Sequence, residues 1–262
     1  MLLAIDVGNT NSVFALHDKG RVLAVFRCAT NQKKTADEYY TWILTLLQNK
    51  NIPISKIDQV IICTVVPRIL FDLKNLSSNY FGCIPLVVGK ENCKLPIGIR
   101  VDSGAVVGSD RLANTVGAFS EYGGNLIVVD FGTATNFDTV GIDGAYEGGV
   151  IAPGVYLSLK ALHDEAAALP HIDVARPFSP IGRNTIDCMK SGIYWGYIGL
   201  IREICTKIKT ENKSKVKVVA TGGLSPLFDN EKGLFDILDL ELTIKGLVKI
   251  NNFNKDVSHE EK

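Results

Sequence analysis

One short motif, an apolar strand followed by Asp-x-Gly, occurs twice and constrains the fold of this chain more than any other feature. The first copy centres on Asp6 and Gly8, and the second centres on Asp130 and Gly132. The second aspartate follows the first by 124 residues (130 − 6), close to half of the 262-residue chain. This spacing predicts two related halves, each beginning with a strand that ends in a tight polar turn.

Both turns have the chemistry of a phosphate site. Glycine lets the chain reverse sharply and leaves backbone N–H groups accessible to a ligand. A carboxylate repels phosphate unless a cation lies between them, so Asp6 and Asp130 are predicted to hold cations. A single Asp-x-Gly is more often an ordinary hairpin turn, but two copies in equivalent halves favour the phosphate site. Short polar side chains that can bind phosphate oxygens follow the glycines: Asn9, Thr10, Asn11, Ser12, Thr133, Thr135 and Asn136.

Composition limits the partners and the cellular compartment. The chain has 28 basic and 28 acidic residues, so it lacks the basic excess typical of nucleic-acid binding. Its six cysteines are scattered without a Cys-x-x-Cys pair, which favours reduced thiols in a cytoplasmic protein over disulfides or a zinc site. No apolar segment is long enough to span a membrane, and no signal peptide precedes the first predicted strand.

The remaining pattern predicts an α/β fold with mixed sheets flanked by helices. A capping box at Thr35–Glu38 begins a helix with one apolar face. A second helix is predicted over Asp110–Glu121, and the domain boundary is placed within it, giving domains 1–118 and 119–262. The closing helix, Leu242–Asn252, then belongs to the second domain.

A third glycine turn, Thr221–Gly223, lets backbone lie flat against a planar group such as a nucleobase, although Gly-Gly alone is a weak signal.

The three turns in this order resemble the superfamily of actin, Hsp70 chaperones and the sugar and acetate kinases. Four further motifs are Gly108–Arg111, Gly148–Gly154, Ala168–Pro170 and Asn184-Thr185. With these motifs the chain is similar to type III pantothenate kinases from Met1 to about Asn252. The resemblance implies two duplicated ribonuclease H-like domains with the nucleotide in the cleft between them. It also implies ATP-dependent phosphorylation of pantothenate to 4'-phosphopantothenate, the first step of coenzyme A biosynthesis.

The resemblance implies a role for each site residue. Asp110 accepts the proton of the substrate alcohol, and Asp130 binds a monovalent cation, K⁺ or NH₄⁺. Asp6 faces Mg²⁺ or another divalent cation bound with the phosphates. A homodimer is implied, with the helices predicted over Tyr156–Leu169 and Thr185–Ile204 as a plausible interface. Pantothenate is contacted by Gly108, Ser109, Asp110, Arg111 and Thr185, and ATP by Asp6, Val7, Gly8, Asn9, Thr10, Asn11, Ser12, Val13 and Thr133.

The residue chemistry supports these roles independently. An alcohol is a poor nucleophile at neutral pH, so a carboxylate must orient it and take its proton. Asp110 lies at the start of a predicted helix, where the backbone dipoles are expected to keep it ionised. Arg111 offers a fork suited to the carboxylate of pantothenate. The alternative for Ser109-Asp110-Arg111 is an ordinary helix cap followed by a solvated arginine.

One departure from the family pattern keeps other functions open. Val101 stands seven residues before Gly108, where the family commonly has a tyrosine that lines the substrate pocket. One alternative is therefore a kinase or phosphatase of the same superfamily that acts on another small acceptor. A second is a non-catalytic regulatory relative, which would be expected to lose Asp6, Asp110 or Asp130, and all three are present.

Overall fold

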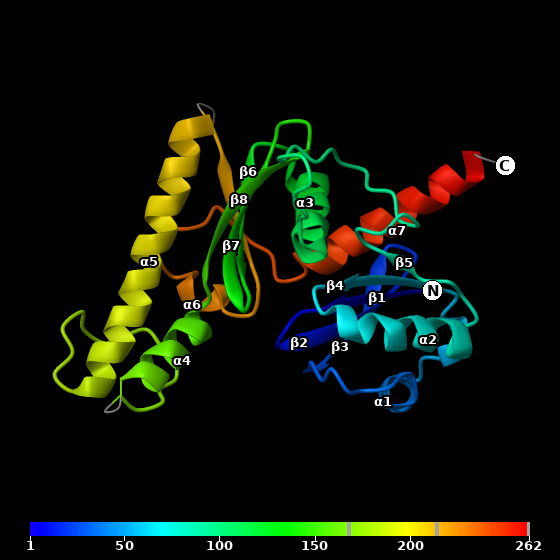
Figure 1. Cartoon of the computed structure of the whole chain (residues 1–262), viewed down its shortest axis with the longest axis horizontal. Coiled ribbons are helices and arrows are strands. Elements are labelled where there is room, and N and C mark those ends of the chain that lie inside the picture. The colour runs from blue at the N-terminus through cyan, green and yellow to red at the C-terminus, as the bar shows by residue number, and fades with distance from the viewer. Residues whose placement is uncertain (167–168, 213–214, 261–262) are drawn as a thin grey trace. The chain divides into compact units, whose positions relative to one another are not determined.

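The computed structural model describes residues 1–166, 169–212 and 215–260, so Ala168 of the motif above lies outside the described residues. The chain divides into two compact units (Figure 1). The first unit contains Met1–Gly98, Asp102–Glu121 and the chain from Leu242 onward, and the second contains Ile99–Val101 and Tyr122–Glu241.

The first unit is built on a five-stranded mixed sheet with the order β3-β2-β1-β4-β5. β1 pairs antiparallel with β2 and parallel with β4, so the first Asp-x-Gly turn is the hairpin that joins the two central strands β1 and β2. The strands are β1 (Leu2–Val7), β2 (Asn11–Asp18), β3 (Arg21–Ala29), β4 (Gln59–Thr64) and β5 (Leu86–Val87).

Helices cover both faces of this sheet, because β1 is apolar on both faces. Leu3 and Ile5 pack in one cluster with α1 (Ala36–Gln48) and α2 (Leu70–Tyr80). Leu2 and Ala4 pack in another with α3 (Ser109–Tyr122) and α7 (Leu242–Glu260). Two short 3₁₀ helices, η1 (Ile54–Lys56) and η2 (Pro67–Ile69), flank β4 in the chain. The predicted capping box is confirmed, with Glu38 and Thr35 bonded reciprocally at the start of α1.

The second unit repeats the same sheet plan, which confirms the predicted duplication. Its order is β10-β9-β6-β7-β8, where β6 pairs antiparallel with β7 and parallel with β9. Tyr194, Ile198 and Ile201 of α5 pack on one face of this sheet. The elements are β6 (Leu126–Phe131), β7 (Ala134–Val140), β8 (Tyr146–Pro153), β9 (Lys217–Thr221), β10 (Ile237–Leu238), α4 (Val155–Glu165), α5 (Thr185–Asn212) and α6 (Ser225–Phe228).

The last helix departs from the predicted domain division. α7 belongs to the first unit, as does all of α3 up to Glu121, and α7 continues to Glu260. The reason is a close backbone contact between α3 and α7. A Cβ atom at Gly246 would collide with the Ala113 carbonyl oxygen, and one at Gly117 would collide with the Leu242 carbonyl oxygen. Glycine at both positions lets α7 pack directly against α3.

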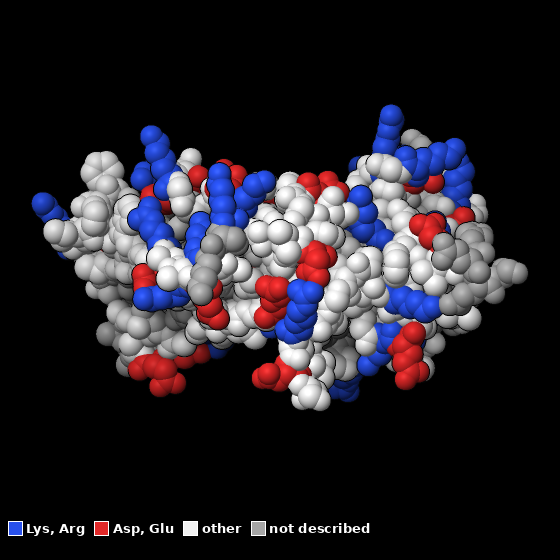
Figure 2. Space-filling view, turned by 90° about the horizontal axis from the view of Figure 1, so that it is seen from above, with Lys and Arg blue, Asp and Glu red and all other residues white. Residues whose placement is uncertain are grey.

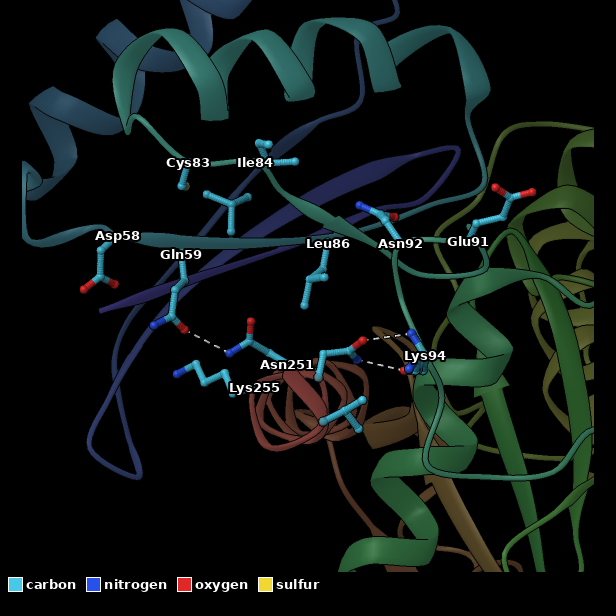
Figure 3. A pocket seen from close by; sticks show the side chains of 13 residues that line it. Asp58, Gln59, Cys83, Ile84, Leu86, Glu91, Asn92, Lys94, Asn251 and Lys255 are labelled. Carbon is cyan, nitrogen blue, oxygen red and sulfur yellow. Dashed lines mark hydrogen bonds between the residues drawn. The ribbon is translucent and has the colours of Figure 1, made fainter. Parts of the chain in front are cut away.

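Amide side chains hold α7 against the sheet farther along (Figure 3). Asn251 Nδ2 donates to Gln59 Oε1 at 3.1 Å, and Asn254 exchanges two hydrogen bonds of 2.8 Å with the Lys94 backbone. These residues border a hollow of about 620 Å³. The hollow lies at Gln59, where β4 begins. The candidate site residues lie at the opposite end of β4.

Candidate active site

The first site residues gather where β1 and β4 end. These strands are parallel, so their carboxyl ends lie at the same edge of the sheet. In the observed register Asp6 is paired with Cys63, and Val7 with Thr64. Asp6 and Cys63 therefore lie side by side on the face that α3 and α7 cover.

The first turn of α3 is joined to the end of β4 by a chain of hydrogen bonds. Cys63 Sγ donates to Ser109 Oγ at 3.3 Å, and Ser109 Oγ donates to the Thr64 carbonyl at 3.0 Å. Burial, with the Asp6 carboxylate close by, raises the pKa of the Cys63 thiol well above its usual value, so the thiol keeps the proton that it donates. The Asp6 and Asp110 carboxylates both contribute to this shift, so the structure places both predicted carboxylates near Cys63.

Asp110 is more basic than its position at a helix start predicts. Burial raises the pKa of this carboxyl, and the hydrogen bond that Oδ1 accepts from the Arg111 N–H at 2.8 Å opposes the shift only in part. Backbone N–H groups at the helix start favour the ionised form, as expected, but loss of solvent has the larger effect on the pKa of this carboxyl. A raised pKa makes the carboxylate a better proton acceptor near neutral pH.

Gly108 leaves the space that the Asp110 carboxylate occupies. A Cβ atom at Gly108 would lie 2.6 Å from Asp110 Oδ1. We expect Gly108→Ala to fold normally, because the flexible carboxylate can rotate away, and to lower kcat about 100-fold through that displacement. Steady-state kinetics and a thermal melt would measure the two effects. Ser103→Ala, an exposed change in the same segment, is the control. A variant with normal kcat would show that the observed carboxylate position is not needed.

The first turn presents an exposed polar surface above a buried residue. Four residues separate Val7 from its partner Ser12, and Gly8 N–H donates to the Asn11 carbonyl at 3.0 Å. The side chains of Asn9, Thr10 and Asn11 are exposed, whereas Ser12 is fully buried.

Thr30 also contacts this turn, and it was not among the predicted residues. Its hydroxyl donates to the Gly8 carbonyl at 2.7 Å, and its N–H donates to the Thr10 carbonyl at 2.9 Å. The pairing of Asn11 with Ala29 in the β2–β3 hairpin brings Thr30 to the turn. That register depends on sheet pairing, and no local motif in the sequence indicated it.

In the second unit the structure joins two of the predicted glycine turns. Asp130 is paired with Thr221 in the parallel register of β6 and β9. The next residue, Gly222, has φ +89°, and a Cβ there would lie 2.6 Å from Asp130 Oδ1 and 2.6 Å from the Phe131 backbone. Only glycine tolerates this conformation and this close approach, so Asp130 lies directly against the Thr221–Gly223 turn.

The remaining predicted residues lie in the second unit as well. Thr133 is exposed, and its carbonyl accepts a hydrogen bond from the Gly154 N–H at 3.1 Å. A Cβ at Gly154 would collide with that carbonyl, which explains why the last residue of the 148–154 motif is glycine. Thr185 is exposed at the start of α5 in the second unit. The other predicted pantothenate contacts, Gly108–Arg111, belong to the first unit.

Asp6 and Asp130 do not belong to a metal site formed by protein side chains alone, as far as the structure describes those side chains. Among the side chains that the structure describes, no group of three or more His, Cys, Asp or Glu could hold a metal ion. Asp6 and Asp130 therefore suit a cation whose other ligands are phosphate oxygens, backbone carbonyls or water.

The length and the apolar character of the helices decide whether one of them could span a membrane. Over the described part of the chain, none is both long and apolar enough to cross a bilayer.

Comparison with known proteins then identifies the family. The family model described as type III pantothenate kinase matches residues 2–207. The chain belongs to the type III pantothenate kinase family. A type III pantothenate kinase of Dinoroseobacter shibae (strain DSM 16493 / NCIMB 14021 / DFL 12) is 56% identical over 256 residues, which cover 98% of this chain and 100% of the relative.

Solved structures with low sequence identity share the fold. One is a conserved putative Baf family transcriptional activator from Campylobacter jejuni, with TM-score 0.59 and 21% identity over 97% of this chain and 99% of that one. Another is a putative 2-dehydro-3-deoxygalactonokinase from Sinorhizobium meliloti, with TM-score 0.57 and 15% identity over 96% of each chain. These similarities show a shared fold and carry nothing about the substrate.

Proposed function

We propose that the protein transfers a phosphoryl group from ATP to the primary alcohol of pantothenate, giving 4'-phosphopantothenate in the first step of coenzyme A synthesis. The observation that carries this proposal is the Asp110 carboxylate, which like Asp6 lies near Cys63 at the end of β4 in a member of the type III pantothenate kinase family. An acceptor alcohol needs a basic carboxylate, and burial makes Asp110 such a group.

The proposed substrate site is the segment Gly108–Arg111. Asp110 orients the pantothenate hydroxyl and takes its proton as the oxygen attacks phosphorus. Arg111 binds the pantothenate carboxylate, since a guanidinium offers two parallel N–H donors. Ser109 anchors this segment to Thr64 and so holds Asp110 in place. Thr185 adds a further pantothenate contact.

The proposed ATP site uses the segment Asp6–Val13 together with Thr133. When bound, Mg²⁺ or another divalent cation neutralises charge on the phosphate oxygens. Asp6 faces that cation, and the backbone and short side chains of the first turn hold the phosphates. Asp130, supported by the close approach of Gly222, holds K⁺ or NH₄⁺. Hard cations take oxygen ligands, so the carboxylates of Asp6 and Asp130 fit these roles.

The state of the cysteines supports the proposed compartment, and exposed residues support the proposed partner and substrate class. All six cysteines are free thiols, as is usual in the reducing cytoplasm. Tyr156, Leu157 and Ile186 are exposed apolar residues on α4 and α5, and they suit the interface of a homodimer. Figure 2 shows basic and acidic side chains scattered together on the face drawn, and with the balanced net charge this supports a small-molecule substrate over a nucleic acid.

A direct assay tests the proposed reaction. We expect the purified protein to form phosphopantothenate when ATP, Mg²⁺ and K⁺ are supplied, and to lose most of its activity when Na⁺ replaces K⁺. Coupled ADP release, with mass analysis of the product, would measure this. The same assay over a panel of acceptor alcohols tests whether Val101 has changed the substrate. Faster transfer to another alcohol would replace pantothenate in the proposal, and no transfer to any would favour a non-catalytic relative.

A further inference from the structure

We propose that Thr30 is a positioning residue for the first phosphate turn, acting through a chain of hydrogen bonds that runs from Ser12 to Thr30 to Gly8. The inference rests on the proposed function, because it takes the turn at Gly8–Asn11 to bind the phosphates of ATP. It assigns a role to Thr30, and it gives Ser12 a supporting role in place of direct contact with the nucleotide.

Counting hydrogens sets the direction of this chain. Thr30 Oγ1 lies 2.7 Å from the Gly8 carbonyl oxygen, which can only accept, so the single hydroxyl hydrogen of Thr30 is donated there. Ser12 Oγ lies 2.9 Å from the same Thr30 oxygen and must therefore be the donor of that bond. Ser12 is fully buried, and its only hydrogen is used inside the protein. Thr30 is therefore the link between the buried start of β2 and the exposed turn.

The bond to Gly8 controls the direction of an amide in the turn. The Gly8–Asn9 peptide bond is trans, so the Gly8 carbonyl and the Asn9 N–H lie in one plane and point in opposite directions. Because the carbonyl points to Thr30, the Asn9 N–H points away from Thr30. Asn9 is an exposed residue of the turn, and in the proposed role this N–H is the donor that an approaching anion meets.

A second bond from Thr30 fixes the far side of the turn. The Thr30 N–H donates to the Thr10 carbonyl at 2.9 Å. Gly8 and Thr10 are thus both held by Thr30, one through its side chain and one through its backbone. Removing the hydroxyl alone leaves the backbone bond in place, so the hairpin is retained while the Gly8–Asn9 peptide becomes free to rotate.

The test compares Thr30→Val with a matched control on the same unit. Thr45→Val removes a hydroxyl that donates to the Thr41 carbonyl at 2.9 Å on the exposed face of α1. We expect Thr30→Val to raise KM for ATP about tenfold, as expected for the loss of one or two neutral hydrogen bonds. KM for pantothenate should stay unchanged, Thr30→Ser should restore most of the ATP affinity, and Thr45→Val should behave as wild type.

A binding measurement separates this inference from the proposed reaction. The dissociation constant of a non-hydrolysable ATP analogue with Mg²⁺, measured by calorimetry without pantothenate, should rise with KM for ATP in Thr30→Val. Ser12→Ala should weaken binding in the same direction, and the double variant should add little, because both residues act through one chain. If the wild type binds the analogue but does not phosphorylate pantothenate, only the proposed reaction fails.

Three results would overturn the role of Thr30. The first is normal affinity for the analogue in Thr30→Val. The second is an equal rise of both KM values together with a lower melting temperature, which a merely structural residue would give. The third is a wild-type protein that binds no ATP analogue, since the turn would then not be a phosphate site.

Discussion

Replacing Asp110 with Asn is expected to lower kcat for pantothenate phosphorylation by about 10²- to 10⁴-fold, the usual contribution of a general base. The amide keeps nearly the same shape and can still accept the hydrogen bond from the Arg111 N–H. It cannot take the proton of the alcohol. KM values for both substrates should change much less than kcat, because the lost interaction belongs to the transition state.

The same substitution should not destabilise the fold. The pKa of Asp110 is raised by burial, so at neutral pH the folded protein holds an ionised carboxylate that is better solvated in the unfolded chain. This penalty is complete above the folded pKa, shrinks as pH falls toward the unfolded pKa, and is absent below it. We therefore expect the melting temperature of Asp110→Asn at pH 7 to equal or exceed that of the wild type.

The pH profile provides a second readout for Asp110. Activity of the wild type should fall as pH is lowered, because protonation removes the base, and the midpoint should lie above the pKa of an ordinary aspartate. Asp256→Asn, an exposed change on α7, is the control and should keep wild-type activity. Near-normal kcat in Asp110→Asn, or a loss explained by unfolding in the melt, would contradict the assignment.

Replacing Gly246 with Ala is expected to be the most destabilising small substitution in the first unit. The added methyl group would collide with the Ala113 carbonyl oxygen, which is helix backbone and cannot rotate away. Overpacking of this kind costs about 1–3 kcal/mol or more, which exceeds the roughly 1 kcal/mol that alanine gains over glycine in a helix. Chemical denaturation followed by circular dichroism would measure the loss.

The outcome for Gly246 bears on the site as well as on stability. α7 packs against α3, whose first turn carries Asp110, so separation of the two helices should also reduce activity. Asn252→Ala, at an exposed position of the same helix, should leave the free energy of unfolding nearly unchanged or slightly higher. If Gly246→Ala were as stable as Asn252→Ala, the close contact of α3 and α7 would not exist in solution.

Local motifs predicted much of the fold because their causes are local. The Asp-x-Gly turns gave β1–β2 and β6–β7 correctly, since a strand followed by glycine and short polar residues favours a hairpin whatever lies around it. The capping box at Thr35 predicted the start of α1 for the same reason. The sequence also predicted the helix that begins at the Gly108–Arg111 motif.

By itself, the sequence determined the two strand–turn–strand repeats, their glycine turns and the family motifs, because each of these depends on residues that are neighbours in the chain. Only the tertiary structure decided that α7 packs with the first unit, that Cys63 and Ser109 join Asp110 to β4, and that Thr30 contacts the first turn. These contacts join residues far apart in the chain, through sheet register and helix packing. Burial, which raises the pKa of Asp110 against the helix dipole, likewise exists only after the chain has folded.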